Sequence, residues 1–250
     1  MSLTEQIKRA IAITKKDIRI YYSKGPVIIF GLLFPFFLFL AYTIGREISA
    51  RELMPGLIGM TVFFTSTSIG PGIIPWETRS KTFERLICCP VEFWAILLGD
   101  MFSSVIFGTM ISIIPVIFTL LFLGLDLTSF IIIVLSLILA SLCFSALGVL
   151  LSSYPPTDIP ATAMMLSSLV KFPMVFVSGI FIPVERLPYW GRVISSISPL
   201  TYFTDITRHL ILNNGYYMLP LDFLAIVLFT AFFVYAAIKM HERTLPQRIS

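Results

Sequence analysis

Charge is scarce in this sequence. Asp, Glu, Lys and Arg make up 13% of its 250 residues, whereas hydrophobic residues make up 57% and the mean hydropathy is +0.92. Soluble domains carry about 25% charged residues, so the composition excludes an ordinary soluble fold, and with it nucleic-acid binding by a basic surface. The net charge of +4 is better explained by membrane topology and contact with anionic lipid.

The chain also lacks the motifs of common catalytic sites. No glycine is followed by Lys and then Ser or Thr, as a phosphate-binding P-loop requires, and no HExxH zinc motif occurs. The three cysteines, Cys88, Cys89 and Cys143, have no metal-ligand spacing. We therefore expect that the chain is not an enzyme and that it holds no cofactor or metal itself.

Six runs are long and apolar enough to cross a bilayer as helices. A span takes about 20 residues, because backbone groups in hydrocarbon must pair within their own segment. The runs are residues 26–44, 54–74, 95–122, 127–151, 161–182 and 221–240. We predict an all-α integral membrane protein that forms one transmembrane domain over residues 1–250, with six transmembrane helices.

The placement of Lys and Arg, which accumulate in cytoplasmic loops, predicts the orientation. The first twenty residues carry charge throughout and do not resemble a signal peptide, so we expect the N-terminus in the cytosol. The cytoplasmic cations are then Lys8, Arg9, Lys15, Lys16, Arg19, Lys24, Arg79, Lys81, Arg85, Lys239, Arg243 and Arg248. The outer ones are Arg46, Arg51, Arg186, Arg192 and Arg208. This asymmetry predicts a multi-pass membrane protein with both termini cytosolic.

Two amphipathic segments are expected on the cytoplasmic side. In residues 1–24, an apolar stripe at roughly helical spacing predicts a helix in the membrane interface, acting as a lipid anchor or also as a docking surface. This stripe consists of Leu3, Ile7, Ala10, Ile11 and Ile18. In residues 76–93, the apolar residues Phe83, Leu86, Ile87 and Pro90 also share one helical face. We expect this second helix to lie flat on the cytoplasmic surface.

Several polar side chains lie inside the predicted spans. Lys171 is well within 161–182, where inserting a cation costs about 2.5–3.5 kcal/mol, so it either snorkels, pairs with protein groups or faces a transport path. The hydroxyls of Thr65, Ser66, Thr67 and Ser68 either bond to their own helix or face such a path. Ser141, Ser145, Gly148 and Ser152 share one face of 127–151 and would let another helix pack closely.

Residues 183–219 are neither a membrane span nor a short loop. The run "SGIFIPVERLPYWGRVISSISPLTYFTDITRHLI" resembles the signature region of the type-2 ABC transporter permeases (the ABC-2 family). The inner run "KTFERLICCPVEFWAILLGD" is similar to the cytosolic coupling region of that family. Both occur in the family's order, and the resemblance covers nearly the whole chain.

The resemblance implies a re-entrant helical hairpin over residues 183–219, broken at Pro183, Pro188 and Pro199 and with Trp190 at the polar boundary. Such irregular backbone must be buried in protein or line a cavity. The alternative is an outer loop that rests on the membrane. The resemblance also implies that a coupling helix contacts a separate ABC ATPase, which binds ATP and Mg, and that two permease copies form a homodimer. The coupling residues are then Thr82, Phe83, Glu84, Arg85, Leu86 and Ile87.

Two positions depart from the family pattern. The inner motif usually has Gly before its Thr, where this chain has Lys81. The following span often begins with Gly and a basic residue, where this chain has Gly99 and Asp100.

The expected function is the membrane subunit of an ATP-driven exporter of a lipid, a drug or a lipid-linked glycan. Its candidate substrate path includes Lys171 and the hydroxyl run Thr65, Ser66, Thr67 and Ser68. One alternative is a membrane scaffold or regulator that transports nothing. Another is a secondary transporter driven by an ion gradient, which is disfavoured because the acidic residues nearest the spans lie toward span ends. These are Asp100, Asp126, Asp158 and Asp222.

Overall fold

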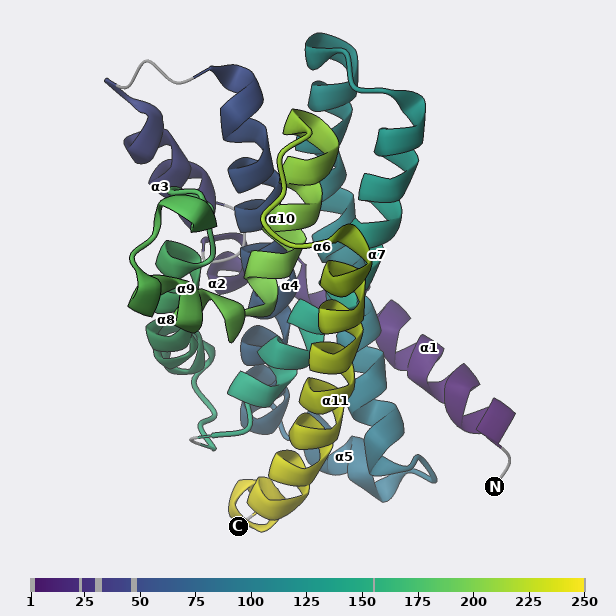
Figure 1. Ribbon diagram of the computed structural model, residues 1–250. Helices are drawn as coiled ribbons and strands as arrows, with labels where there is room; N and C mark the ends of the chain where they lie inside the picture. Colours follow the sequence, from purple (N-terminus) through teal and green to yellow (C-terminus); the bar gives the residue numbers. More distant parts are fainter. Residues whose placement is uncertain (1–2, 23, 30–32, 46–48, 155, 250) are drawn as a thin grey trace.

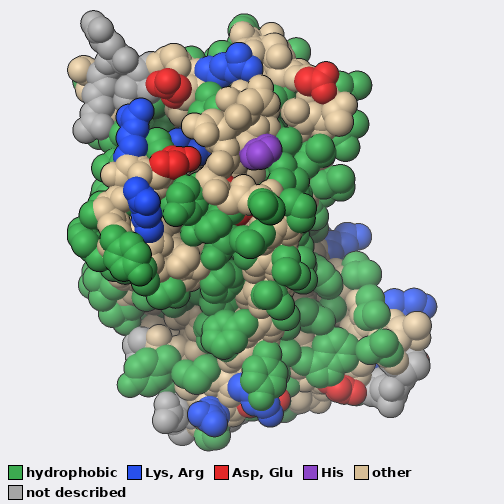
Figure 2. Space-filling model, viewed as in Figure 1, with side chains coloured by type: hydrophobic (Ala, Val, Ile, Leu, Met, Phe, Trp, Pro, Cys, Tyr) green, Lys and Arg blue, Asp and Glu red, His purple; other side chains and the backbone are tan. Residues whose placement is uncertain are grey.

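The computed structural model describes residues 3–22, 24–29, 33–45, 49–154 and 156–249 and is drawn in Figure 1. Throughout these ranges the regular elements are helices, as the composition predicted. On the face shown in Figure 2, hydrophobic side chains cover much of the middle of the molecule, and charged side chains lie mostly toward its two ends. This distribution is typical of a helical bundle that crosses a bilayer.

Five helices within the described ranges are long and apolar enough to cross a membrane. They are α4 (Ala50–Arg79), α6 (Phe93–Leu123), α7 (Leu127–Leu151), α8 (Pro160–Val177) and α11 (Leu219–Ile249). They correspond to five of the six predicted spans. Helix α8 ends at Val177, before the predicted boundary at residue 182, because the chain turns at Gly179, whose φ of +78° favours glycine.

The remaining predicted span, 26–44, contains two helices, α2 (Gly25–Ile28) and α3 (Phe34–Thr43). Residues 30–32 between them lie outside the described ranges. Helix α3 has 10 residues and so is about 15 Å long, about half the hydrocarbon thickness of a bilayer. A sixth transmembrane helix therefore stays a prediction.

Helix α4 is the centre of the bundle. In the most apolar 18-residue stretch of α4, 89% of the residues are buried within the chain. In the corresponding stretch of α11, 22% are buried. It contacts α6, α7, α8 and α10 (Pro199–Leu212). From the predicted small face of α7, Gly148 packs on it and leaves room for the backbone of Thr67. Ser141 and Ser152 of that face instead contact Thr109 of α6 and His241 of α11.

Helix α1 (Leu3–Tyr21) lies beside the start of α6 and has two different faces. The buried face consists of Gln6, Ala10, Ile13, Thr14 and Asp17. The predicted apolar stripe is mostly left uncovered, with Leu3, Ile7 and Ile11 exposed. Ala10 was wrongly assigned to that stripe, since it packs beneath Gly99 of α6.

The segment after α8 contains a 3-10 turn, η2 (Val184–Arg186), then α9 (Tyr189–Ser196) and α10. Pro183 and Pro188 immediately precede η2 and α9, and Pro199 is the first residue of α10. Helix α9 leaves Tyr189 and Trp190 exposed, whereas α10 is buried continuously over residues 199–207 against α4, α7 and α11.

The two ends of the chain lie toward the same end of the bundle as α5 (Thr82–Cys88), at the bottom of Figure 1. The loop between α6 and α7 lies at the opposite end. The assignment of the lower end to the cytosol stays a prediction.

Candidate functional site

The segment between the second and third predicted spans forms the short helix α5, which is anchored by one side chain. Phe83 is 1% exposed and packs with Ile13 of α1 and Ile96 of α6. Leu86 and Ile87 are half-buried around the same cluster. The predicted stripe ends there, because α5 stops at Cys88 and Pro90 lies beyond it, exposed. The residue before Pro90, Cys89, is extended, as residues preceding proline usually are.

The remaining coupling residues lie at the surface or at the junction with α4. Glu84 is half-buried and Arg85 is exposed. The Thr82 hydroxyl donates a hydrogen bond to the backbone oxygen of Glu77, at 3.3 Å, and so ties the start of α5 to the end of α4. Helix α5 is therefore connected to α1, α4 and α6 together.

Beside this junction, four charged residues from three helices form a buried cluster. Lys16 and Asp17 belong to α1, Glu77 to α4 and Asp100 to α6. The Lys16 ammonium contacts the Glu77 carboxylate and lies 3.0 Å from the Asp17 carboxylate. The side chains of Asp17 and Glu77 and the whole of Asp100 are 0% exposed. Sequence reasoning placed Asp100 at a span end and did not predict its burial.

The cluster holds three carboxyl groups against one ammonium. Burial lowers the pKa of Lys16, but the carboxylates of Glu77, Asp17 and Asp100 outweigh this effect, so its pKa is raised and it stays charged. Burial raises the pKa of Asp17, and Lys16 offsets only part of that rise. The Asp17 carboxyl lies near that of Asp100, and two neighbouring carboxylates disfavour each other's ionisation.

The structure brings Lys171 to the hydroxyl run of α4. Lys171 is 0% exposed, and its ammonium donates to the Ser68 hydroxyl at 3.4 Å, so it pairs within the protein and does not snorkel. The hydroxyls of Thr65 and Thr67 donate to backbone oxygens one turn earlier, those of Thr61 and Phe63.

Ser66 faces Gly108 of α6, where the two helices approach closely. All four residues of the run are therefore in packing contacts, and their assignment to a substrate path stays a prediction.

In the proline-broken segment, residues 178–212, side chains donate hydrogen bonds to backbone oxygens that a continuous helix would have paired. Thr204 donates to Ser178, Thr201 to Ser195 and Tyr202 to Ser196, each at 2.7 Å. Arg192 donates to the backbone oxygens of Glu185 and Leu187. This satisfaction is what a non-helical backbone at membrane depth requires. The depth of the segment in a membrane stays a prediction.

Comparison with known families decides the relationship. A family model described as ABC-2 type transporter matches residues 8–212, which include most of α1, all of α5 and the segment from η2 to α10. The chain belongs to the ABC-2 type transporter family. The resemblance seen in the two sequence motifs is thereby confirmed.

Individual ABC-2 relatives are similar at modest identity. The chain is 28% identical over 168 residues to the transport permease ycf38 of Cyanophora paradoxa, covering 65% of this chain and 56% of the relative. It is 24% identical over 168 residues to the "Probable multidrug ABC transporter permease YbhR" of Escherichia coli, covering 65% and 44%. For the "Inner membrane transport permease YadH" of the same organism, the identity is 24% over 159 residues, covering 63% and 60%. The chain thus spans about half the length of the curated relatives that it matches.

The structure shows the surroundings of the two positions that depart from the ABC-2 pattern. Lys81, where the family usually has glycine, has a φ of 55°, in the left-handed region that glycine adopts without strain. Asp100, where the family often has a basic residue, lies in the buried cluster near Lys16 of α1.

We predict that Lys81→Gly stabilises the protein. A side chain in the left-handed region costs about 1 kcal/mol, and Lys81 is exposed, so its removal sacrifices little contact. The free energy of unfolding, measured in detergent micelles, should rise by about 0.5–1 kcal/mol. The matched control is Lys81→Ala, which removes the charge but keeps the strained side chain. Equal stabilisation by both variants would show that charge, not backbone strain, is responsible.

Proposed function

We propose that this chain is the membrane subunit of an ATP-driven ABC exporter in the inner membrane. It works as a homodimer whose two copies form the path for a hydrophobic or amphipathic substrate, such as a lipid, a drug or a lipid-linked glycan. ATP and Mg bind to a separate ATPase at the α5 end of the bundle, which faces the cytosol together with both termini. The family membership, and relatives named as transport permeases, support this proposal.

The observation that carries the coupling part of the proposal is the anchoring of α5. Because Phe83 is inserted between α1 and α6 and Thr82 is bonded to the end of α4, a push on α5 acts on three helices at once. Interiors packed this tightly transmit displacement and do not absorb it. ATP-driven closure of the partner would thereby shift the helices that surround the candidate substrate path.

The surface around α5 is suited to a partner. A shallow cavity of about 250 Å³ lies between α1 and α5, lined by side chains that include Ile20, Arg85 and Leu86. Arg85 is exposed and forms no ion pair with any described residue. It is thus available to a carboxylate on the ATPase surface.

Co-purification tests the proposal. The tagged protein, extracted from its native membrane in a mild detergent, should retain a stoichiometric ABC ATPase that hydrolyses ATP. Arg85→Glu should reduce the retained ATPase at least about tenfold, because a matched charge becomes a repulsive one. The control is Arg243→Glu, an exposed charge reversal on α11, near the C-terminal end of the chain. A folded, dimeric protein that retains no ATPase would refute the ATP-driven mechanism and favour gradient-driven transport or a scaffold role.

A further inference from the structure

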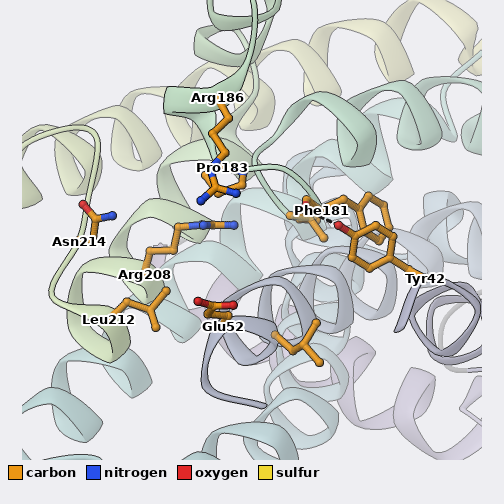
Figure 3. A pocket seen from close by; sticks show the side chains of 10 residues that line it. Tyr42, Glu52, Phe181, Pro183, Arg186, Arg208, Leu212 and Asn214 are labelled. Carbon is orange, nitrogen blue, oxygen red and sulfur yellow. Dashed lines mark hydrogen bonds between the residues drawn. The ribbon is translucent and has the colours of Figure 1, made fainter. Parts of the chain in front are cut away.

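A cavity of about 250 Å³ lies at the end of the bundle opposite α5. Four parts of the chain form it, namely the end of α3, the start of α4, the segment from the turn after α8 through η2, and the end of α10 with Asn214 after it. Figure 3 shows its principal side chains, which are Tyr42, Glu52, Phe181, Pro183, Arg186 and Arg208. No part of the coupling machinery contributes to it.

Two guanidinium groups meet in this cavity. Arg186 and Arg208 come from different elements, and their side chains extend toward each other in Figure 3. Arg208 is half-buried and donates to the backbone oxygen of Gly179 at 2.6 Å. Of the carboxylates in the described ranges, none lies within ion-pair distance of either guanidinium. Most of their hydrogen-bond donors are thus left for a ligand.

The side chains that line the cavity carry more positive than negative charge. Burial lowers the pKa of Arg208, because it disfavours the charged guanidinium. Glu185 and Asp205 oppose this lowering, and Arg186 adds to it. Glu52 is the only acidic side chain among the residues that line the cavity. The lining thus carries two cations and one carboxylate, and the Glu185 and Asp205 carboxylates act on Arg208 from outside the lining without forming an ion pair with it.

The apolar border of the cavity points to an amphipathic ligand. The Tyr42 hydroxyl donates to the backbone oxygen of Phe181 at 2.6 Å, and the two rings lie 4.4 Å apart, centroid to centroid. Phe176, which is 55% exposed, packs beside Phe181 at 5.5 Å. An exposed aromatic surface thus lies beside the two arginines. A ligand could place its head group on the arginines and its acyl chain on this surface.

We propose that the Arg186–Arg208 cavity binds the phosphate head group of an amphipathic molecule. Planar guanidinium groups recognise phosphate oxygens through paired hydrogen bonds, and two of them can share one phosphate. Glu52 at the border disfavours a second negative charge. The assignment of this ligand to the transported substrates rests on the proposed function, whereas the binding itself requires neither an ATPase nor ATP.

Binding to the full chain, purified in a neutral maltoside detergent, tests the proposal directly. The probe is dodecyl phosphate at about pH 5, where its phosphate carries about one negative charge. Native mass spectrometry measures the fraction of protein that retains one molecule at each probe concentration. Arg186→Gln should weaken binding about tenfold, because it removes a charge-assisted contact. Glu52→Gln should strengthen binding, because it removes the repelling carboxylate. Arg243→Gln, at the other end of the bundle, should change nothing.

The design separates folding from binding and one ligand source from another. Arg208→Gln also loses the bond to Gly179 and is informative only if its thermal stability is retained, whereas Arg186 is exposed and makes no hydrogen bond to a described residue. Equal retention of the probe by wild type and Arg186→Gln would overturn the proposal. Inorganic phosphate binding as tightly as dodecyl phosphate would overturn the amphipathic assignment, and so would equal binding of dodecanol. Because no ATPase is present, failure here is distinguishable from failure of the proposed function.

Discussion

Replacing Lys16 with methionine should destabilise the folded protein by about 3–5 kcal/mol. The Lys16 ammonium contacts the side chains of Asp17 and Glu77, which are both 0% exposed, and Asp100 lies close enough to influence its charge. Methionine fills a similar volume but supplies no cation. A buried carboxylate that loses its cation keeps the full cost of desolvation, so removing one member of such a pair is strongly destabilising. Thermal denaturation in detergent micelles measures the loss.

The neighbouring lysine provides a matched control. Lys15 is exposed, so Lys15→Met makes the same chemical change without touching the cluster and should alter stability by no more than about 0.5 kcal/mol. The double variant Lys16→Met/Glu77→Gln should recover part of the loss, because it also removes one of the buried carboxylates. If Lys16→Met proved as stable as Lys15→Met, the carboxyls would have to be neutral without Lys16, and the ionic description of the cluster would be wrong.

This cluster also marks the limit of what the sequence predicts. The long helices follow from hydrophobicity, because the requirement for internal backbone hydrogen bonding leaves few alternatives in a bilayer. The contact between Asp17, Glu77 and Asp100 depends on the packing of α1, α4 and α6, and no local pattern encodes it. Each residue taken alone resembles an ordinary charge near the end of a helix.

Hydrophobicity also fails to identify the inward face of a membrane helix. In α1 the conspicuous stripe of Leu3, Ile7 and Ile11 is exposed, while the face with Thr14 and Asp17 is buried. In water an apolar stripe marks the core, but lipid is as apolar as a protein interior. Close contacts between membrane helices are then made by small and polar residues. The sequence contains such residues at Ser66, Gly108 and Gly148, but it does not predict which residue of another helix each of them contacts.

In the segment after α8 the breaks between helices were predicted, because their signals are local, whereas the re-entrant hairpin stays a prediction. Proline restricts its own φ and lacks a donor, so Pro183, Pro188 and Pro199 marked the starts of η2, α9 and α10. The pairing of Arg186 with Arg208 across a cavity was not predicted, because these residues belong to different elements whose packing brings them together.

Gly148→Ala should prevent the native packing of α7 on α4. A methyl group at Gly148 would lie 2.7 Å from the backbone oxygen of Thr67 and 2.9 Å from its Cα, and backbone atoms cannot move aside as a side-chain end can. Alanine favours helix over glycine by about 1 kcal/mol, yet we expect a net destabilisation of about 2 kcal/mol, because overpacking forces the two helices apart. Stability in detergent micelles and the yield of monodisperse protein are the measurements.

Two further alanine variants separate this close approach from the general effect of replacing glycine. Gly70→Ala on α4 should be about as harmful as Gly148→Ala, because its methyl would lie 2.8 Å from the backbone nitrogen of Val149 at the same crossing point. The double variant should cost less than the sum, since one separation of the helices relieves both clashes. Gly25→Ala has nothing within 4 Å and should be neutral or slightly stabilising. If Gly148→Ala and Gly25→Ala were equally stable, α4 and α7 would not cross as closely as Gly148 and Thr67 indicate, and the central position of α4 would need revision.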